Sequence, residues 1–68
     1  MEKKKVVKFP NLVGEMAKNG ETQKTIGNLL GLKPSTISRK LSGQIDWSIG
    51  EVEILCEYFG KDYYQLFK

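Results

Sequence analysis

The chain of 68 residues is long enough for one domain and too short for two. Its 40% hydrophobic and 28% charged residues are typical of a globular protein rather than a disordered one. One cysteine excludes an internal disulfide, and the lack of histidine excludes the usual zinc frameworks. No apolar run is long enough for a membrane span or a signal-peptide core. We therefore predict a cytoplasmic protein of a bacterial or phage-infected cell.

The formal charge of +3 is unevenly distributed along the chain. Residues 1–8 are rich in lysine, and we predict that they form a basic N-terminal arm before a single domain of residues 9–68. Residues 22–44 contain basic residues and no acidic one, whereas residues 45–68 are net acidic. A segment without carboxylates can meet a polyanion on one face, so this distribution directs attention to residues 22–44.

Helical periodicity predicts the first two elements. Apolar residues that recur from Phe9 at helical spacing indicate a helix over about 10–19, which the following Asn19-Gly20 ends. Thr22 is a candidate cap for a second helix, and Gly31 is its expected end.

Three further helices follow. Pro34 suits the first turn of a helix over about 34–42, and Gly43 closes it. Capping boxes at Ser48–Glu51 and Asp62–Gln65 open a fourth helix and a short terminal one. The apolar face expected for the fourth helix consists of Ile49, Val52, Leu55, Cys56 and Phe59. Because no useful alternating pattern is present, the predicted fold class is all-α, with five short helices around one core.

Residues 23–43 place two short helices around a tight glycine-containing turn, which is the signature of a helix-turn-helix. Gly31 can adopt the positive φ of that turn, and Gly27 lies where the third helix would cross close to the second. The positions expected to face inward and lock the two helices are Ile26, Leu30, Leu32, Ile37 and Leu41.

The third helix divides into two sides at about 100° per residue. Ser35, Arg39 and Ser42 lie opposite the apolar residues, with Thr36 at the flank. An α-helix fits the major groove, small hydroxyl side chains let it approach the bases, and Arg39 is suited to a bidentate contact with guanine. Candidate phosphate contacts around this face are Thr22, Gln23, Lys24, Lys33, Ser38, Lys40 and Ser42.

The chain resembles the helix-turn-helix family of the phage Cro protein and phage repressor DNA-binding domains, the xenobiotic-response-element family of regulators. The resemblance covers about residues 9–67. It rests on Gln23, Ile26, Leu30, Gly31, Leu32, on the run 37–43 and on the later pattern from Ile49 to Phe67. It implies a compact lambda-repressor-like domain in which Gln23 contacts phosphate. It also implies that Pro34, Ser35 and Arg39 face the bases.

Three residues depart from this family pattern. Gly27 stands where alanine is usual, and Pro34 replaces a polar side chain at the first base-facing position. Lys40 occupies a position that is commonly apolar, so its stem would have to pack while its ammonium reaches outward.

The predicted function is sequence-specific binding of double-stranded DNA by a transcriptional regulator, a repressor, with the third helix in the major groove. The alternative is a protein-interaction module, such as an antitoxin or a co-regulator, with secondary DNA binding. An enzyme is not expected, because the histidine, glycine-rich phosphate loop and paired carboxylates that such chemistry uses are missing. No metal, cofactor or small-molecule ligand is expected.

The C-terminal aromatic and apolar residues are candidate contacts of a homodimer: Phe59, Tyr63, Tyr64, Leu66 and Phe67. Such a dimer would bind pseudo-palindromic half-sites about 34 Å apart. We further expect Trp47 to pin its loop against the core, and Glu51 to lie on the solvated face of the fourth helix with Glu53 and Glu57.

Overall fold

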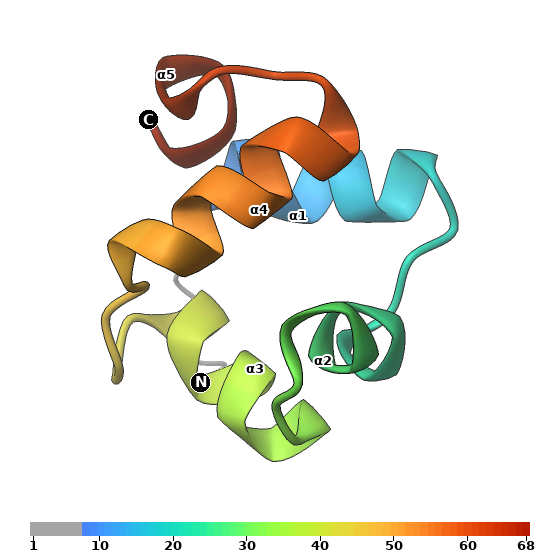
Figure 1. Cartoon of the computed structure of the whole chain (residues 1–68), viewed down its shortest axis with the longest axis vertical. Coiled ribbons are helices and arrows are strands. Elements are labelled where there is room, and N and C mark those ends of the chain that lie inside the picture. Colours follow the sequence, from blue (N-terminus) through green and yellow to red (C-terminus); the bar gives the residue numbers. More distant parts are fainter. Residues whose placement is uncertain (1–7) are drawn as a thin grey trace, which may run out of the picture.

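The computed structural model describes residues 8–68, so nearly all of the predicted basic arm lies outside the described residues. The elements in chain order are α1 (Pro10–Lys18), α2 (Gln23–Leu30), α3 (Pro34–Ser42), α4 (Ile49–Phe59) and α5 (Tyr63–Phe67). Within residues 8–68 there is no strand, which confirms the all-α fold class. Figure 1 shows α1, α4 and α5 at one end of the molecule, with α2 and α3 together at the other.

Side-chain caps fix the starts of three helices. The Thr22 hydroxyl accepts a hydrogen bond from the Thr25 amide at 3.2 Å at the start of α2. The Ser48 hydroxyl accepts one from the Glu51 amide at 3.2 Å, and the Glu51 carboxylate accepts one from the Ser48 amide at 3.0 Å. The box predicted from Asp62 opens α5 in the same way. These contacts satisfy backbone N–H groups that a first helical turn leaves without partners, so the predicted helix starts are confirmed.

The core lies where all five helices meet. Its buried apolar side chains are Leu12, Met16, Ile26, Ile37, Leu55, Leu66 and Phe67. Leu66 is fully buried and Phe67 is only 8% exposed, so the prediction that these two residues contact a second copy is wrong. The reason is that α5 folds back onto α1 and α4 and turns its two apolar residues inward. Phe59 is half-buried against the same core, whereas Tyr63 and Tyr64 are exposed.

An aromatic cluster joins the residue before α1 and the last residue of α5 to the loop before α4. The ring centroids of Phe9 and Trp47 lie 6.4 Å apart, and each lies 5.9 Å from that of Phe67, all with edge-to-face geometry. Rings arranged in this way attract one another through their quadrupoles. Trp47 therefore holds its loop against the core, as predicted.

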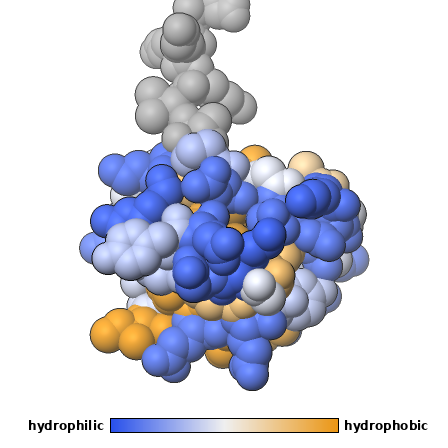
Figure 2. All heavy atoms as spheres, turned by 90° about the horizontal axis from the view of Figure 1, so that it is seen from above, coloured by the Kyte–Doolittle hydropathy of each residue, from blue (hydrophilic) through white to orange (hydrophobic). Residues whose placement is uncertain are grey.

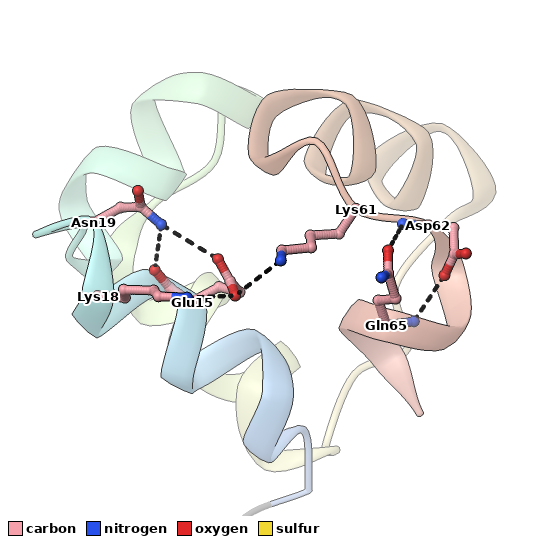
Figure 3. A network of polar contacts seen from close by, with 6 residues as sticks. All are labelled: Glu15, Lys18, Asn19, Lys61, Asp62 and Gln65. Atoms are coloured by element: carbon pink, nitrogen blue, oxygen red, sulfur yellow. Dashed lines mark hydrogen bonds and ion pairs between the residues drawn. The ribbon is translucent and has the colours of Figure 1, made fainter.

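A polar network on the surface ties α1 to the connection between α4 and α5 (Figure 3). The Glu15 carboxylate lies 3.7 Å from the ammonium groups of both Lys18 and Lys61. Exposed pairs of this kind contribute about 0–1 kcal/mol each, so the network aligns the two segments more than it stabilises them.

Candidate nucleic-acid interface

The turn between α2 and α3 is closed by a direct backbone approach. A Cβ atom on Gly27 would lie 2.5 Å from the Leu32 carbonyl oxygen and 3.6 Å from Cγ1 of Ile37. The Leu32 amide donates to the Gly27 carbonyl at 2.8 Å, while Gly31 between them has a φ of +72°. Only a residue without a side chain fits Gly27 at this distance, so α3 is held against α2 by the turn as well as by the buried Ile37.

The outer face of α3 carries small polar side chains and one guanidinium. Ser35, Ser38 and Arg39 are exposed, Pro34 is exposed at the first turn, and Thr36 is half-buried. Only Ile37 and Lys40 are buried in α3. The helix thus presents hydroxyl groups and the Arg39 side chain on the side that the sequence predicts.

The carbonyl of Arg39 is fully engaged, in contrast to its exposed side chain. It accepts hydrogen bonds from the Gln44 amide at 2.9 Å and from the Ser42 hydroxyl at 3.0 Å. Ser42 is exposed, so this hydrogen bond at the helix terminus leaves its side chain at the surface. The phosphate contact predicted for Ser42 stays a prediction.

The N-terminus of α2 is exposed. Thr22 uses its hydroxyl oxygen as a cap, while Gln23 and Lys24 occupy the first helical positions and are exposed. Amides at these positions have no acceptor within a helix and lie at the positive end of its dipole. Such a terminus favours a phosphate oxygen.

The Glu21 carboxylate, next to the start of α2, is bound by a residue of α4. The Tyr58 hydroxyl donates to the Glu21 carboxylate at 2.6 Å. This hydrogen bond lowers the pKa of Glu21 and raises that of Tyr58. It ties to α4 the acidic group that directly precedes α2, a link that the local sequence does not predict.

Two further cations flank the α3 face. Lys33 is the exposed N-cap of α3. The stem of exposed Lys8 lies over Gly43 at the other end, since a Cβ on that glycine would meet the Lys8 methylenes at 3.2–3.3 Å. Lys8 was assigned to the arm by its neighbours in sequence, whereas the fold places it at the end of α3.

Lys40 differs from the other basic residues of this segment. Its ammonium lies 2.9 Å from the Glu51 carboxylate, donates to the Asp46 carbonyl at 2.9 Å, and lies 5.7 Å from the centre of the Trp47 ring. The whole residue is only 6% exposed. The predicted phosphate contact by Lys40 is therefore wrong, because its charge is already neutralised inside the protein.

The prediction for Glu51 on α4 is also wrong. It is half-buried rather than part of the solvated face, and it joins the start of α4 to α3 through Lys40. Burial acts to raise the pKa of Glu51, but hydrogen bonds from the Ser48 amide and from Lys40 outweigh it, and the pKa lies below its ordinary value. The pair thereby connects the end of α3 to a capped, well-fixed helix start.

Within residues 8–68, no group of three or more histidine, cysteine, aspartate or glutamate side chains is arranged to hold a metal ion. In the same described part, no helix is both long enough and apolar enough to cross a membrane.

These features define a small all-helical domain with a polar, cationic α2–α3 surface. The chain belongs to the BetR domain family, whose model matches residues 11–68, from α1 to the C-terminal residue. Neither a curated protein nor a solved structure matches the chain.

Proposed function

We propose that this protein is a sequence-specific transcriptional regulator, a repressor, that binds double-stranded DNA through a helix-turn-helix formed by α2 and α3. The observation that carries the proposal is the exposed face of α3, on which Arg39 has no carboxylate partner within residues 8–68, while the ammonium of the neighbouring Lys40 is bound inside the protein. The resemblance to Cro-type and repressor domains with a lambda-repressor-like fold supports the same reading. Its place of action would be the cytoplasm, where bacterial and phage DNA lies.

In the proposed complex, α3 enters the major groove and α2 crosses the backbone. Arg39 contacts a guanine, and Ser35 and Thr36 let the start of α3 approach the base edges. Pro34 packs at the first base-facing position without donating a hydrogen bond. Phosphates are bound by the start of α2 at Gln23 and Lys24, and by one cation at each end of the α3 face, Lys33 and Lys8.

Selection from a randomised duplex pool tests this proposal. We expect an enriched motif, and we expect Arg39→Ala to lose about 1–3 kcal/mol on that motif while it relaxes the preference at one base pair. Lys61→Ala is the matched control, since it removes one positive charge at the α4–α5 connection, far from α3 in Figure 1. Equal losses by Arg39→Ala on selected and random duplexes would contradict direct base contact.

The salt dependence separates phosphate contacts from base contacts. Lys24→Ala should weaken binding to all sequences and reduce the slope of log affinity against log salt by about 1. If neither the selected nor the random duplex is retained at low salt, the DNA-binding proposal fails. A stable protein complex recovered from the native host would then favour the interaction module.

A further inference from the structure

A groove rich in aromatic side chains lies beside the start of α4, outside the α2–α3 surface. Its volume is about 540 Å³, and the aromatic residues that line it are Phe9, Trp47, Tyr63 and Phe67. They come from the residue before α1, from the loop before α4 and from α5, so only the folded chain brings them together. Ligand sites in proteins have volumes of about 300–1,000 Å³, so the groove is large enough for a small organic molecule.

Two apolar side chains of α4 also line the groove. Val52 is half-buried, whereas Ile49 is 79% exposed at the first position of the helix. The sequence predicts that Ile49 faces the core with Leu55, and the structure contradicts this. Figure 2 shows that the hydrophilic surface gives way to a protruding apolar group at one edge of the molecule. The Ser48–Glu51 capping box fixes the backbone at the start of α4, so this apolar contact surface has a defined position.

The charged side chains of the groove are acidic. Asp46 and Glu53 line it, and among residues 8–68 no basic side chain does. Both are exposed, and neither forms an ion pair within that part of the chain. Carboxylates without a counter-ion beside an apolar surface attract cations, so the charge of the groove favours a positively charged ligand.

Two rings of the groove lie close to ammonium groups of the chain itself. The Lys68 ammonium is 5.7 Å from the centre of the Tyr63 ring, and the Lys40 ammonium is 5.7 Å from the centre of the Trp47 ring. The negative face of an aromatic ring attracts a cation at this distance. Lys40 is neutralised by Glu51, 2.9 Å away, so it opposes an incoming cation only weakly. Lys68 has no ion pair within the described residues, so it competes with such a cation for Tyr63.

We propose that this groove binds an organic ammonium ion with an apolar body, such as a protonated arylalkylamine. The apolar body packs against Trp47 and Ile49, while the carboxylates of Asp46 and Glu53 attract the ammonium group. The sequence by itself does not predict such a ligand, because its chemistry depends on residues that the fold brings together. The site lies outside the α2–α3 surface, so its ligand does not depend on the proposed DNA binding.

Titration of the full chain with three compounds of similar shape and different charge tests the proposal. The compounds are 2-phenylethylammonium, 2-phenylethanol and phenylacetate, and the emission of Trp47, the single tryptophan, reports binding. We expect the ammonium compound to bind with a Kd of about 1 mM or below, which is typical of so small a ligand. It should bind about tenfold more tightly than the alcohol, and phenylacetate should bind least. Equal affinities for the three compounds would overturn the proposal, as would an unchanged emission up to about 50 mM of the ammonium compound.

A matched pair of variants tests the role of the carboxylates. Glu53→Gln should weaken binding of the ammonium compound about threefold and leave binding of the alcohol unchanged, because exposed charge pairs have about this strength. Unchanged binding of the alcohol shows in the same sample that the groove is folded. Glu57→Gln is the control, since Glu57 is also exposed on α4 and does not line the groove. Equal losses in the two variants would indicate attraction by net charge alone and would contradict the proposed site.

Removal of Lys68 should have the opposite effect. Lys68→Ala should strengthen binding of the ammonium compound about twofold, because the ring of Tyr63 then has no competing ammonium. A weaker affinity in this variant would contradict the proposal. So would an emission of Trp47 that changes with the concentration of the protein alone and does not respond to the ammonium compound, because a second copy would then occupy the groove.

Discussion

The pairs α2–α3 and α4–α5 have the same local plan and differ in chemistry. In both, a side-chain cap opens the first helix and a glycine of positive φ, Gly31 or Gly60, ends it. The second helix of the first pair presents exposed hydroxyl groups and Arg39, whereas that of the second pair turns apolar residues into the core. The comparison teaches that turn residues set the path of the chain, while the side chains between them decide which face remains available for a partner.

The largest expected effect concerns the inward side of α5. Leu66→Ala should lower the free energy of unfolding by about 4 kcal/mol, because it opens a cavity at a fully buried position. Tyr64→Ala, at a side chain that is 72% exposed, should change it by about 0.5 kcal/mol or less. Urea unfolding of both variants measures the difference. A small loss for Leu66→Ala would return α5 to the surface role that the sequence suggested.

The next largest expected effect on stability concerns the Lys40–Glu51 ion pair, which links the two helix pairs. Lys40→Ala should cost about 3 kcal/mol, because it leaves the Glu51 carboxylate without its partner in a partly buried site. Lys40→Met with Glu51→Gln should recover much of this loss by removing both charges while keeping an apolar stem. Urea unfolding checks both values.

In the proposed complex with DNA, the salt dependence of binding separates Lys40 from Lys33. Lys33→Ala should reduce the slope by about 1, whereas Lys40→Met should leave it unchanged. A reduced slope for Lys40→Met would restore Lys40 as a phosphate contact.

The tight turn between α2 and α3 predicts an effect on stability that is somewhat smaller than that of Lys40→Ala. Gly27→Ala should cost about 2 kcal/mol, since the new Cβ would lie 2.5 Å from the Leu32 carbonyl oxygen and α3 must shift. Gly14→Ala in α1 has nothing within 4 Å of the added atom, so it should instead stabilise by about 0.5–1 kcal/mol. Thermal unfolding of the two variants tests the contrast, which equal effects would remove.

The smallest expected effect is the acid dependence of the Lys40–Glu51 link. Because the pKa of Glu51 is below its ordinary value of 4.5 in the folded protein, its contribution is complete above that value. The contribution is lost as the pH falls through the folded-state pKa. The wild-type protein should therefore be more stable than Glu51→Gln at neutral pH, and the difference should shrink in acid. Glu53→Gln, at an exposed neighbour, controls for the general loss of a carboxylate. A difference that grows in acid would contradict this sign.

Local rules determined much of this protein. The starts of α2, α4 and α5 depend on caps within four residues, and the ends of α2 and α3 depend on glycines of positive φ. The same rules predicted the exposed Ser35–Arg39 side of α3 and the close approach at Gly27, because helical periodicity and nearby backbone contacts act over short distances.

Tertiary structure decided the rest. The capping box at Ser48–Glu51 predicts where α4 begins, but not that Glu51 also binds Lys40 across the loop. Likewise, the sequence by itself determined the apolar character of Ile49 and Leu66, while only the packing of α4 and α5 decided that the first is exposed and the second buried. The physical reason is range: caps, turns and periodicity act within a few residues, whereas burial and ion pairing depend on which distant segments meet in the folded chain.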